Sequence, residues 1–155
     1  MAAVSAVMRA LYSGRRADAE AAADDGHDLT VFEAAALGRD DALARVLTTD
    51  PDAARARSDD GFLAIHYACF FGTPACTAAL LDAGAPLDEP SRNDMGVRPV
   101  NAAAAGPHPV DQLRLLLERG ADVNGRQASG HTALDEARSR DLPELIDLLE
   151  GHGAA

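Results

Sequence analysis

Apolar residues recur along this chain at the spacing of amphipathic helices. Leu43, Val46 and Leu47 fall on one face of a helix. Segment 144–150 places leucine and isoleucine on one face and acidic residues between them. The pattern predicts helices with one buried face and one solvated face. The helix predicted at 144–150 has the two faces that a C-terminal cap requires.

A motif at residues 61–68 returns twice. Its copies begin at Gly61, Gly96 and Gly130, at spacings of 35 and 34 residues. Self-similarity at about this period, with a turn and two helices in each unit, indicates an array of stacked units rather than a globule around one core. The glycines allow the positive φ of a tight turn. We expect an all-α solenoid of helix-turn-helix units with short β-turn tips.

The repeated motif and the residues after it resemble the ankyrin repeat. The matching pieces are Ile65-His66-Tyr67-Ala68, Gly72, Leu80-Leu81 and Gly84-Ala85, then Gly120-Ala121-Asp122-Val123-Asn124, and finally Thr132-Ala133-Leu134. The resemblance implies an ankyrin-repeat solenoid over essentially the whole chain, which we treat as one domain. Such proteins generally bind a partner in the concave groove formed by the turn tips and the exposed ends of the first helices.

The repeat divides the chain into units. We expect a truncated N-terminal cap at 1–29, then unit 1 at 30–57, unit 2 at 58–92, unit 3 at 93–125, and unit 4 with the C-terminal cap at 126–155. The cap is truncated because the distance from Gly14 to Gly38 leaves no room for a hairpin turn. The polar stretch 50–57 reads as a loop. Pro74 and Pro143 are predicted to begin second helices, where a missing amide donor costs little.

Composition limits the classes of binding partner and the cellular compartment to be expected. The net charge of -11 argues against nucleic acid or an anionic membrane as partner, because phosphate binding draws on clustered basic residues. With no apolar run long enough to span a membrane and no signal core, we expect a cytoplasmic protein. All 14 basic residues are Arg, which suggests a GC-rich, bacterial genome. The two cysteines, Cys69 and Cys76, are then reduced thiols.

The resemblance assigns partner-binding positions to the groove. They are Asp59, Asp60 and Phe62 on the tip of unit 2, Met95 and Val97 on the next tip, and Tyr12, Leu37, Phe70, Phe71 and Arg140 at the ends of first helices. Three of the six aromatic residues of the chain, Phe62, Phe70 and Phe71, belong to this set. Exposed aromatic side chains bury much area on binding, so they suggest an interaction hot spot. The alternative is that some of them are core.

The sequence contains no convincing catalytic or cofactor pattern, so we expect no enzyme and no cofactor. His66 lies near Asp59 and Asp60, but the resemblance gives it a structural role, with the imidazole hydrogen-bonded to neighbouring backbone. The Cys69 and Cys76 pair lacks the short ligand spacing of zinc sites, so we expect no metal.

The leading hypothesis is a monomeric protein that binds another protein through its groove. The acidic tips favour a partner with a basic patch. Two alternatives stay open at this point. In the first, the same groove, with Tyr67 and Leu37, forms a pocket for a small molecule, either for binding alone or in a minor enzyme that uses His66 or an Asp as an acid-base group. In the second, the protein associates with copies of itself.

Overall fold

A computed structural model describes residues 4–155, and within that range the chain is an all-α repeat solenoid. Helices follow one another in pairs. Their bounds are α1 Ala6–Tyr12, α2 Arg16–Ala23, α3 Val31–Leu37, α4 Asp40–Thr49, α5 Ala64–Phe70, α6 Pro74–Asp82, α7 Pro99–Ala105, α8 Pro109–Glu118, α9 Ala133–Ser139 and α10 Pro143–Gly151. None of the helices in the described range is long and apolar enough to cross a membrane.

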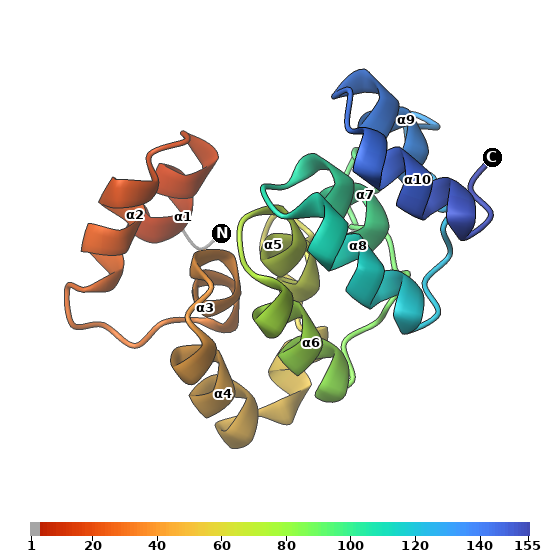
Figure 1. The fold of residues 1–155 in the computed structure, drawn as a ribbon. Helices are drawn as coiled ribbons and strands as arrows, with labels where there is room; N and C mark the ends of the chain where they lie inside the picture. Colours follow the sequence, from red (N-terminus) through yellow and green to blue (C-terminus); the bar gives the residue numbers. More distant parts are fainter. Residues whose placement is uncertain (1–3) are drawn as a thin grey trace.

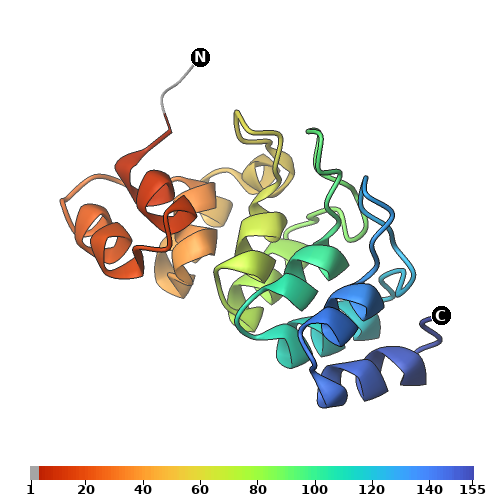
Figure 2. The same ribbon diagram turned by 90° about the horizontal axis from the view of Figure 1, so that it is seen from above.

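The pairs from α3–α4 to α9–α10 lie side by side in a row (Figure 1). In each pair the first helix packs against the first helix of the next pair, so α3, α5, α7 and α9 form one layer. The helices α4, α6, α8 and α10 form a second layer that packs against the first. The loops that precede α5, α7 and α9 project from the same side of the row (Figure 2).

Proline and threonine define where many of these helices begin. Helices α6 and α10 begin at Pro74 and Pro143, as the sequence predicts. Before α3, the Thr30 side chain accepts a hydrogen bond from the Glu33 amide, and the Glu33 carboxylate accepts one from the Thr30 amide. This reciprocal pair satisfies two amide groups that the first turn of a helix leaves without partners.

Tight turns form the projecting tips. Gly61, Gly96 and Gly130 have φ values of 84°, 52° and 87°, which confirms the predicted positive φ. Neighbouring tips are joined by backbone, because the Arg92 amide donates to the Gly61 carbonyl at 2.9 Å. A side chain at Gly61 would overlap the Arg92 carbonyl, so glycine is required there for space as well as for conformation.

One hydrophobic core runs through the row from α3 to α10. Its first-helix layer contains Ala34, Ala68, Ala103 and Ala137, all with no exposed surface. Small side chains let the successive helices approach closely, as the sequence predicts. Gly72 lies at one such approach, where an added Cβ would overlap the Ala35 carbonyl of the preceding pair.

The N-terminal pair, α1 and α2, has a separate hydrophobic cluster. Val7, Met8 and Leu11 pack there against Ala36 and Leu37 at the end of α3. The pair therefore covers the C-terminal end of α3, and residues 24–30 lead from α2 to α3. The division of the chain into units remains a prediction, because helix positions alone do not fix where one unit ends.

The polar stretch before the first tip is not a simple loop. Residues Pro51–Arg55 form a 3₁₀ helix, η1, in which Ala53 and Ala54 are buried. The prediction of a loop was wrong because these two small apolar residues reach the core. The Arg55 side chain fixes η1 to the loop after α6 by donating a hydrogen bond to the Gly84 carbonyl at 3.0 Å.

Candidate functional site

The tips and the first helices enclose an apolar pocket of about 570 Å³. We call this pocket and its rim the aromatic groove. Its lining comes from α1 (Leu11, Tyr12), from α5 and the residue after it (His66, Tyr67, Phe70, Phe71), from α7 (Asn101, Ala102, Ala105), and from the loops (Gly14, Phe62, Met95, Val97, Gln127). Elements that are far apart in the sequence therefore line the same pocket.

All six aromatic residues of the chain join in one cluster beside this pocket. Tyr67 is at its centre, with ring centroids 5.4 Å from Phe62, 5.9 Å from Phe32 and 6.4 Å from Tyr12. Phe71 lies 6.1 Å from Tyr12 and 4.7 Å from Phe70, in edge-to-face geometry. Such contacts favour a fixed arrangement of the rings, so the aromatic groove has a preformed wall.

The tyrosine hydroxyls form a short polar chain along one side of the groove. Tyr12 and Tyr67 are 2.8 Å apart at their hydroxyl oxygens. Tyr12 donates to the Asp60 carboxylate at 3.0 Å, and the Tyr67 hydroxyl lies 2.9 Å from the Ser58 hydroxyl. Burial raises the pKa of both phenols, so both stay neutral and protonated. This chain ties α1 to the first tip.

The predicted groove residues differ in exposure. Phe70 and Met95 are 41% and 58% exposed, and Tyr12 is exposed as well. Phe62 and Phe71 are half-buried and pack against the N-terminal cluster. Both alternatives for the three phenylalanines therefore apply in part, because Phe70 faces solvent while the other two also support the fold.

Two residues predicted on the groove surface are buried. Leu37 is 4% exposed, because α1 and α2 cover the end of α3, and it does not line the pocket. Val97 is 8% exposed and belongs to the main core, although it also forms part of the pocket floor. Sequence position alone could not show that the N-terminal pair folds over Leu37.

Charged groups occupy the rim of the groove. Asp59 and Asp60 are exposed on the first tip, as expected. Arg140 is exposed directly after α9, where its guanidinium donates to the Ala104 and Gly106 carbonyls at 2.5 and 3.1 Å. Arg16 makes the same kind of contact at the other end of the row. Both arginines are thus bound to the C-terminal ends of first helices, where a cation is favourable.

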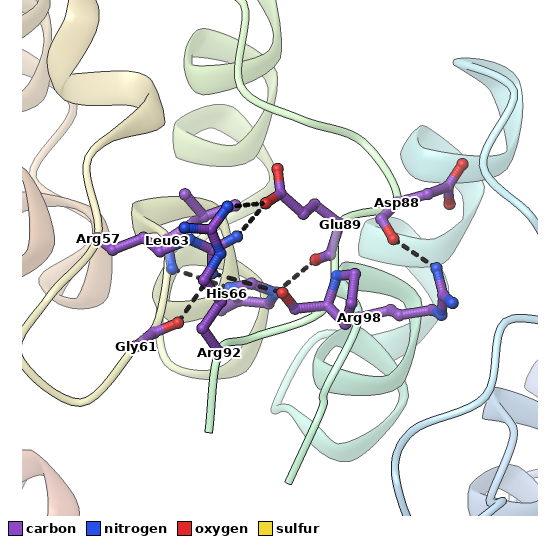
Figure 3. Close-up of polar contacts among 9 residues, drawn as sticks. Arg57, Gly61, Leu63, His66, Asp88, Glu89, Arg92 and Arg98 are labelled. Atoms are coloured by element: carbon purple, nitrogen blue, oxygen red, sulfur yellow. Dashed lines mark hydrogen bonds and ion pairs between the residues drawn. The ribbon is translucent and has the colours of Figure 1, made fainter. Parts of the chain in front are cut away.

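His66 is a structural residue. Its Nδ1 accepts from the Leu63 amide at 3.0 Å, and its Nε2 donates to the Glu89 carbonyl at 3.1 Å (Figure 3). Burial lowers the pKa of His66 to about 4, so the ring is neutral. The Glu89 carboxylate turns instead to Arg57 and Arg92, with which it forms ion pairs (Figure 3). The imidazole has no free nitrogen for proton transfer.

The two cysteines occupy buried positions within the helix layers. Cys69 and Cys76 are unbridged and buried, on α5 and α6 respectively. Burial raises the pKa of each thiol to about 12, which makes both poor nucleophiles. Within residues 4–155, no cluster of three or more His, Cys, Asp or Glu side chains is arranged to hold a metal ion.

The sequence did not identify Tyr67 and Phe32 as parts of the aromatic cluster at the groove. Tyr67 appeared only in the small-molecule alternative, because it sits in the motif at a position that the repeat treats as variable. Phe32 lies in the divergent first unit, at a position to which the motif assigns no role in the groove. A signal did exist, since a chain with only six aromatic residues that places most of them in adjacent units is expected to bring them together.

Comparison with known proteins places the chain among repeat proteins of several kingdoms. It is 33% identical over 115 residues to a mouse (Mus musculus) B-cell lymphoma 3 protein homolog, covering 72% of this chain and 25% of that protein. It is 41% identical over 83 residues to an ankyrin repeat-containing protein of the bacterium Treponema pallidum, covering 54% of this chain and 27% of that protein.

A third relative is the ankyrin repeat domain-containing protein SAT10 of the fungus Stachybotrys chartarum, 31% identical over 124 residues, which are 80% of this chain and 6% of the fungal protein. The chain thus spans about a quarter or less of the relatives it matches. A family model for ankyrin repeats in three copies matches residues 31–127. That range includes α3 to α8 and two of the three tips, and so by sequence and by architecture this protein belongs to the ankyrin repeat family.

Proposed function

We propose that this protein binds another protein through the aromatic groove. Ankyrin repeats are general protein–protein interaction modules, and the family is generally non-enzymatic. The observation that carries the proposal is the exposure of Phe70 and Met95 at the mouth of a preformed apolar pocket. Large apolar side chains on a surface are expected to contribute most of the affinity when a partner covers them.

Charge supports a partner with a basic patch. The chain carries a net charge of -11, and the exposed Asp59, Asp60 and Asp94 lie on the tips beside the groove. Complementary charge speeds association and selects among partners, although each exposed pair adds little to affinity. We expect the protein to act as a monomer in the cytoplasm, with its groove open to a client.

The variant that tests the proposal is Phe70→Ala combined with Met95→Ala. These side chains are exposed, so their loss removes binding surface with little effect on the fold. Phe62 and Phe71 are unsuitable, because both pack against the N-terminal cluster. A matched control is Val4→Ala, since Val4 is 41% exposed like Phe70 but lies beyond the opposite end of α1 from Tyr12.

Wild type and both variants are used side by side to purify partners from the native host. We expect at least one client that wild type and the Val4 variant retain and the double variant releases. With that client purified, calorimetry should give an affinity loss of about thirtyfold, since two hot-spot side chains contribute about 1 kcal/mol or more each. Equal retention by all three proteins, with unchanged circular dichroism, contradicts the proposal.

The pocket volume favours a second candidate, a small molecule in the same groove. Pockets for small ligands commonly measure roughly 300 to 1,000 Å³, and this one falls inside that range. A panel of metabolites screened by thermal melting distinguishes the two candidates. A compound that raises the melting temperature of wild type but not of the double variant supports this second function.

A further inference from the structure

Tyr12 closes one end of the aromatic groove. It belongs to α1, yet it passes the end of α3 to reach Tyr67 and Asp60, which are 55 and 48 residues away in sequence. Its ring lies 6.1 Å from that of Phe71. At the other end, α9 contributes no residue to the pocket lining described above. A partner polypeptide that lies along the repeats is therefore blocked by α1. The pocket beside Tyr12 suits a single side chain of that partner.

Most polar side chains that line the pocket are already engaged within the protein. The exception is Gln127 on a loop, whose amide nitrogen donates to the Ser129 hydroxyl and whose amide oxygen has no hydrogen bond within residues 4–155. Both nitrogens of His66 are bonded to backbone, and the Asn101 side chain is occupied by the Arg98 amide and the Gly125 carbonyl. The Tyr67 hydroxyl is held by Ser58 and Tyr12. Among the described residues, no buried side-chain nitrogen or oxygen lacks a partner. A polar group placed beyond the reach of Gln127 would lose its water without replacement, so the pocket favours an apolar side chain.

The rim is different, because it carries free negative charge. Asp59 and Asp94 are exposed on adjacent tips, and neither forms an ion pair or side-chain hydrogen bond within residues 4–155. The cations at the two ends of the groove are already engaged, whereas Arg92, two residues before Asp94, is largely exposed and pairs with Glu89 at 3.5 Å. Arg16 donates to the Phe71 and Leu37 carbonyls, and Arg140 to those of Ala104 and Gly106. The tip side of the groove therefore attracts positive charge.

From these features we infer that the groove recognises a short peptide segment in which one aromatic residue is flanked by Arg or Lys. The aromatic side chain fills the apolar pocket against Tyr12, while the flanking cations pair with Asp59 and Asp94. This inference rests on the proposed function and names the partner's recognition motif. It predicts a compact motif of a few residues rather than a long segment that runs the length of the solenoid.

The protein contains no tryptophan, so a tryptophan peptide reports its own environment. The first probe is a heptapeptide with blocked ends, Gly-Ser-Arg-Trp-Arg-Ser-Gly. The second replaces both arginines with glutamate. On titration with wild-type protein, the emission of the arginine peptide should shift to shorter wavelength and saturate. The glutamate peptide should bind at least tenfold more weakly. The variant Phe70→Ala with Met95→Ala should abolish the shift.

The charge contribution is tested by Asp59→Asn combined with Asp94→Asn. Because exposed ion pairs are weak, we expect the affinity for the arginine peptide to fall roughly fivefold, with little change for the glutamate peptide. The matched control is Asp25→Asn with Asp147→Asn, which removes the same charge from exposed positions on α10 and between α2 and α3. It should bind like wild type. Raising the salt concentration should weaken wild-type binding in the same way.

Several outcomes overturn the inference. One is equal binding of the two peptides, and another is no spectral shift with either. A third is an equal affinity loss in the rim variant and its control. In each case the proposed function survives if a client is still released by the Phe70 and Met95 variant, so the two failures are distinguishable. If the rim variant fails to fold, the salt dependence of wild type decides the charge contribution.

Discussion

At His66 a single imidazole holds together two stretches of backbone, the turn before α5 and the loop that leads to the next tip. Its neighbours in the repeat use other groups for the same task. At the corresponding position of α7, the Asn101 amide accepts from Arg98 and donates to the Gly125 carbonyl at 3.1 Å each. The contact therefore requires one acceptor and one donor, and a histidine supplies them only while it is neutral.

This requirement makes stability depend on pH. The folded protein keeps His66 neutral down to about pH 4, whereas the unfolded chain binds the proton below about pH 6.5. Between these values the unfolded state binds more protons, so stability falls as the pH falls. The loss at pH 5 is roughly 2 kcal/mol. Urea unfolding at pH 7.5 and pH 5 measures it.

The variant His66→Asn provides the comparison, because asparagine already fills this position in α7. It should retain the backbone contacts and lose less stability between pH 7.5 and pH 5 than wild type, by about the same 2 kcal/mol. Other acid-sensitive groups contribute equally to both proteins. An identical pH dependence in the two proteins would show that His66 does not titrate as its burial requires.

At the scale of elements, the N-terminal pair is the least integrated part of the molecule. Helices α1 and α2 have their own hydrophobic cluster, separate from the main core. Polar contacts supplement it. Arg16 donates to the Phe71 and Leu37 carbonyls at 2.8 and 2.9 Å, and Arg39 pairs with Glu20 and Asp24. The apolar contacts of this pair with the rest are limited to the ends of α3 and α5 and the aromatic residues beside them, so we expect it to open before the other helices do.

Hydrogen exchange tests this order of opening. In Arg16→Gln, two charge-assisted hydrogen bonds to the ends of α3 and α5 are lost, each worth about 1 kcal/mol or more. Amides of α1 and α2 should exchange about tenfold faster or more, while those of α7 to α10 keep their wild-type rates. The control Arg114→Gln removes an exposed arginine whose nearest acid is Asp111 at 3.5 Å, and it should change neither set. Uniform acceleration through the chain would instead mean that the pair and the core open together.

At the scale of the whole molecule, the N-terminal pair serves both the fold and the groove. It covers Ala36, Leu37 and Tyr67, and it provides Tyr12 as the end wall of the pocket. The main core does not include residues of α1 or α2. The molecule therefore consists of a self-contained stack and a short N-terminal pair that completes its surface.

Deletion of residues 1–28 separates these roles. We expect the remaining chain to stay helical and to melt cooperatively at a lower temperature, because the main core is intact. The newly exposed apolar patch should promote association, which light scattering detects as a mass above that of the monomer. The chain without the deletion, at the same concentration, is the reference. A truncated chain that is unfolded by circular dichroism would show that the stack depends on the pair.

The repeat could be predicted from the sequence because its determinants are local. Each repeat needs the same backbone features at the same positions. In unit 2 the positive φ of the tip is provided by Gly61, the start of the second helix by Pro74, and the close approach of helices by Ala68. The sequence left open whether Phe70 is exposed or part of the core, and the structure shows that it is exposed. In contrast, the burial of Leu37 depends on where a helix pair from another part of the chain comes to lie.

The sequence by itself thus determined the all-α solenoid, the paired helices, the positive-φ tips and the backbone role of His66. Only the tertiary structure decided that Tyr12 reaches Tyr67 and Asp60, that the six aromatic residues meet, and that Leu37 is covered. The physical reason is the distance along the sequence between the residues in contact. Turns and helix packing within a repeat involve neighbours in sequence, whereas the aromatic groove is closed by a contact across some 50 residues for which the repeat pattern holds no signal.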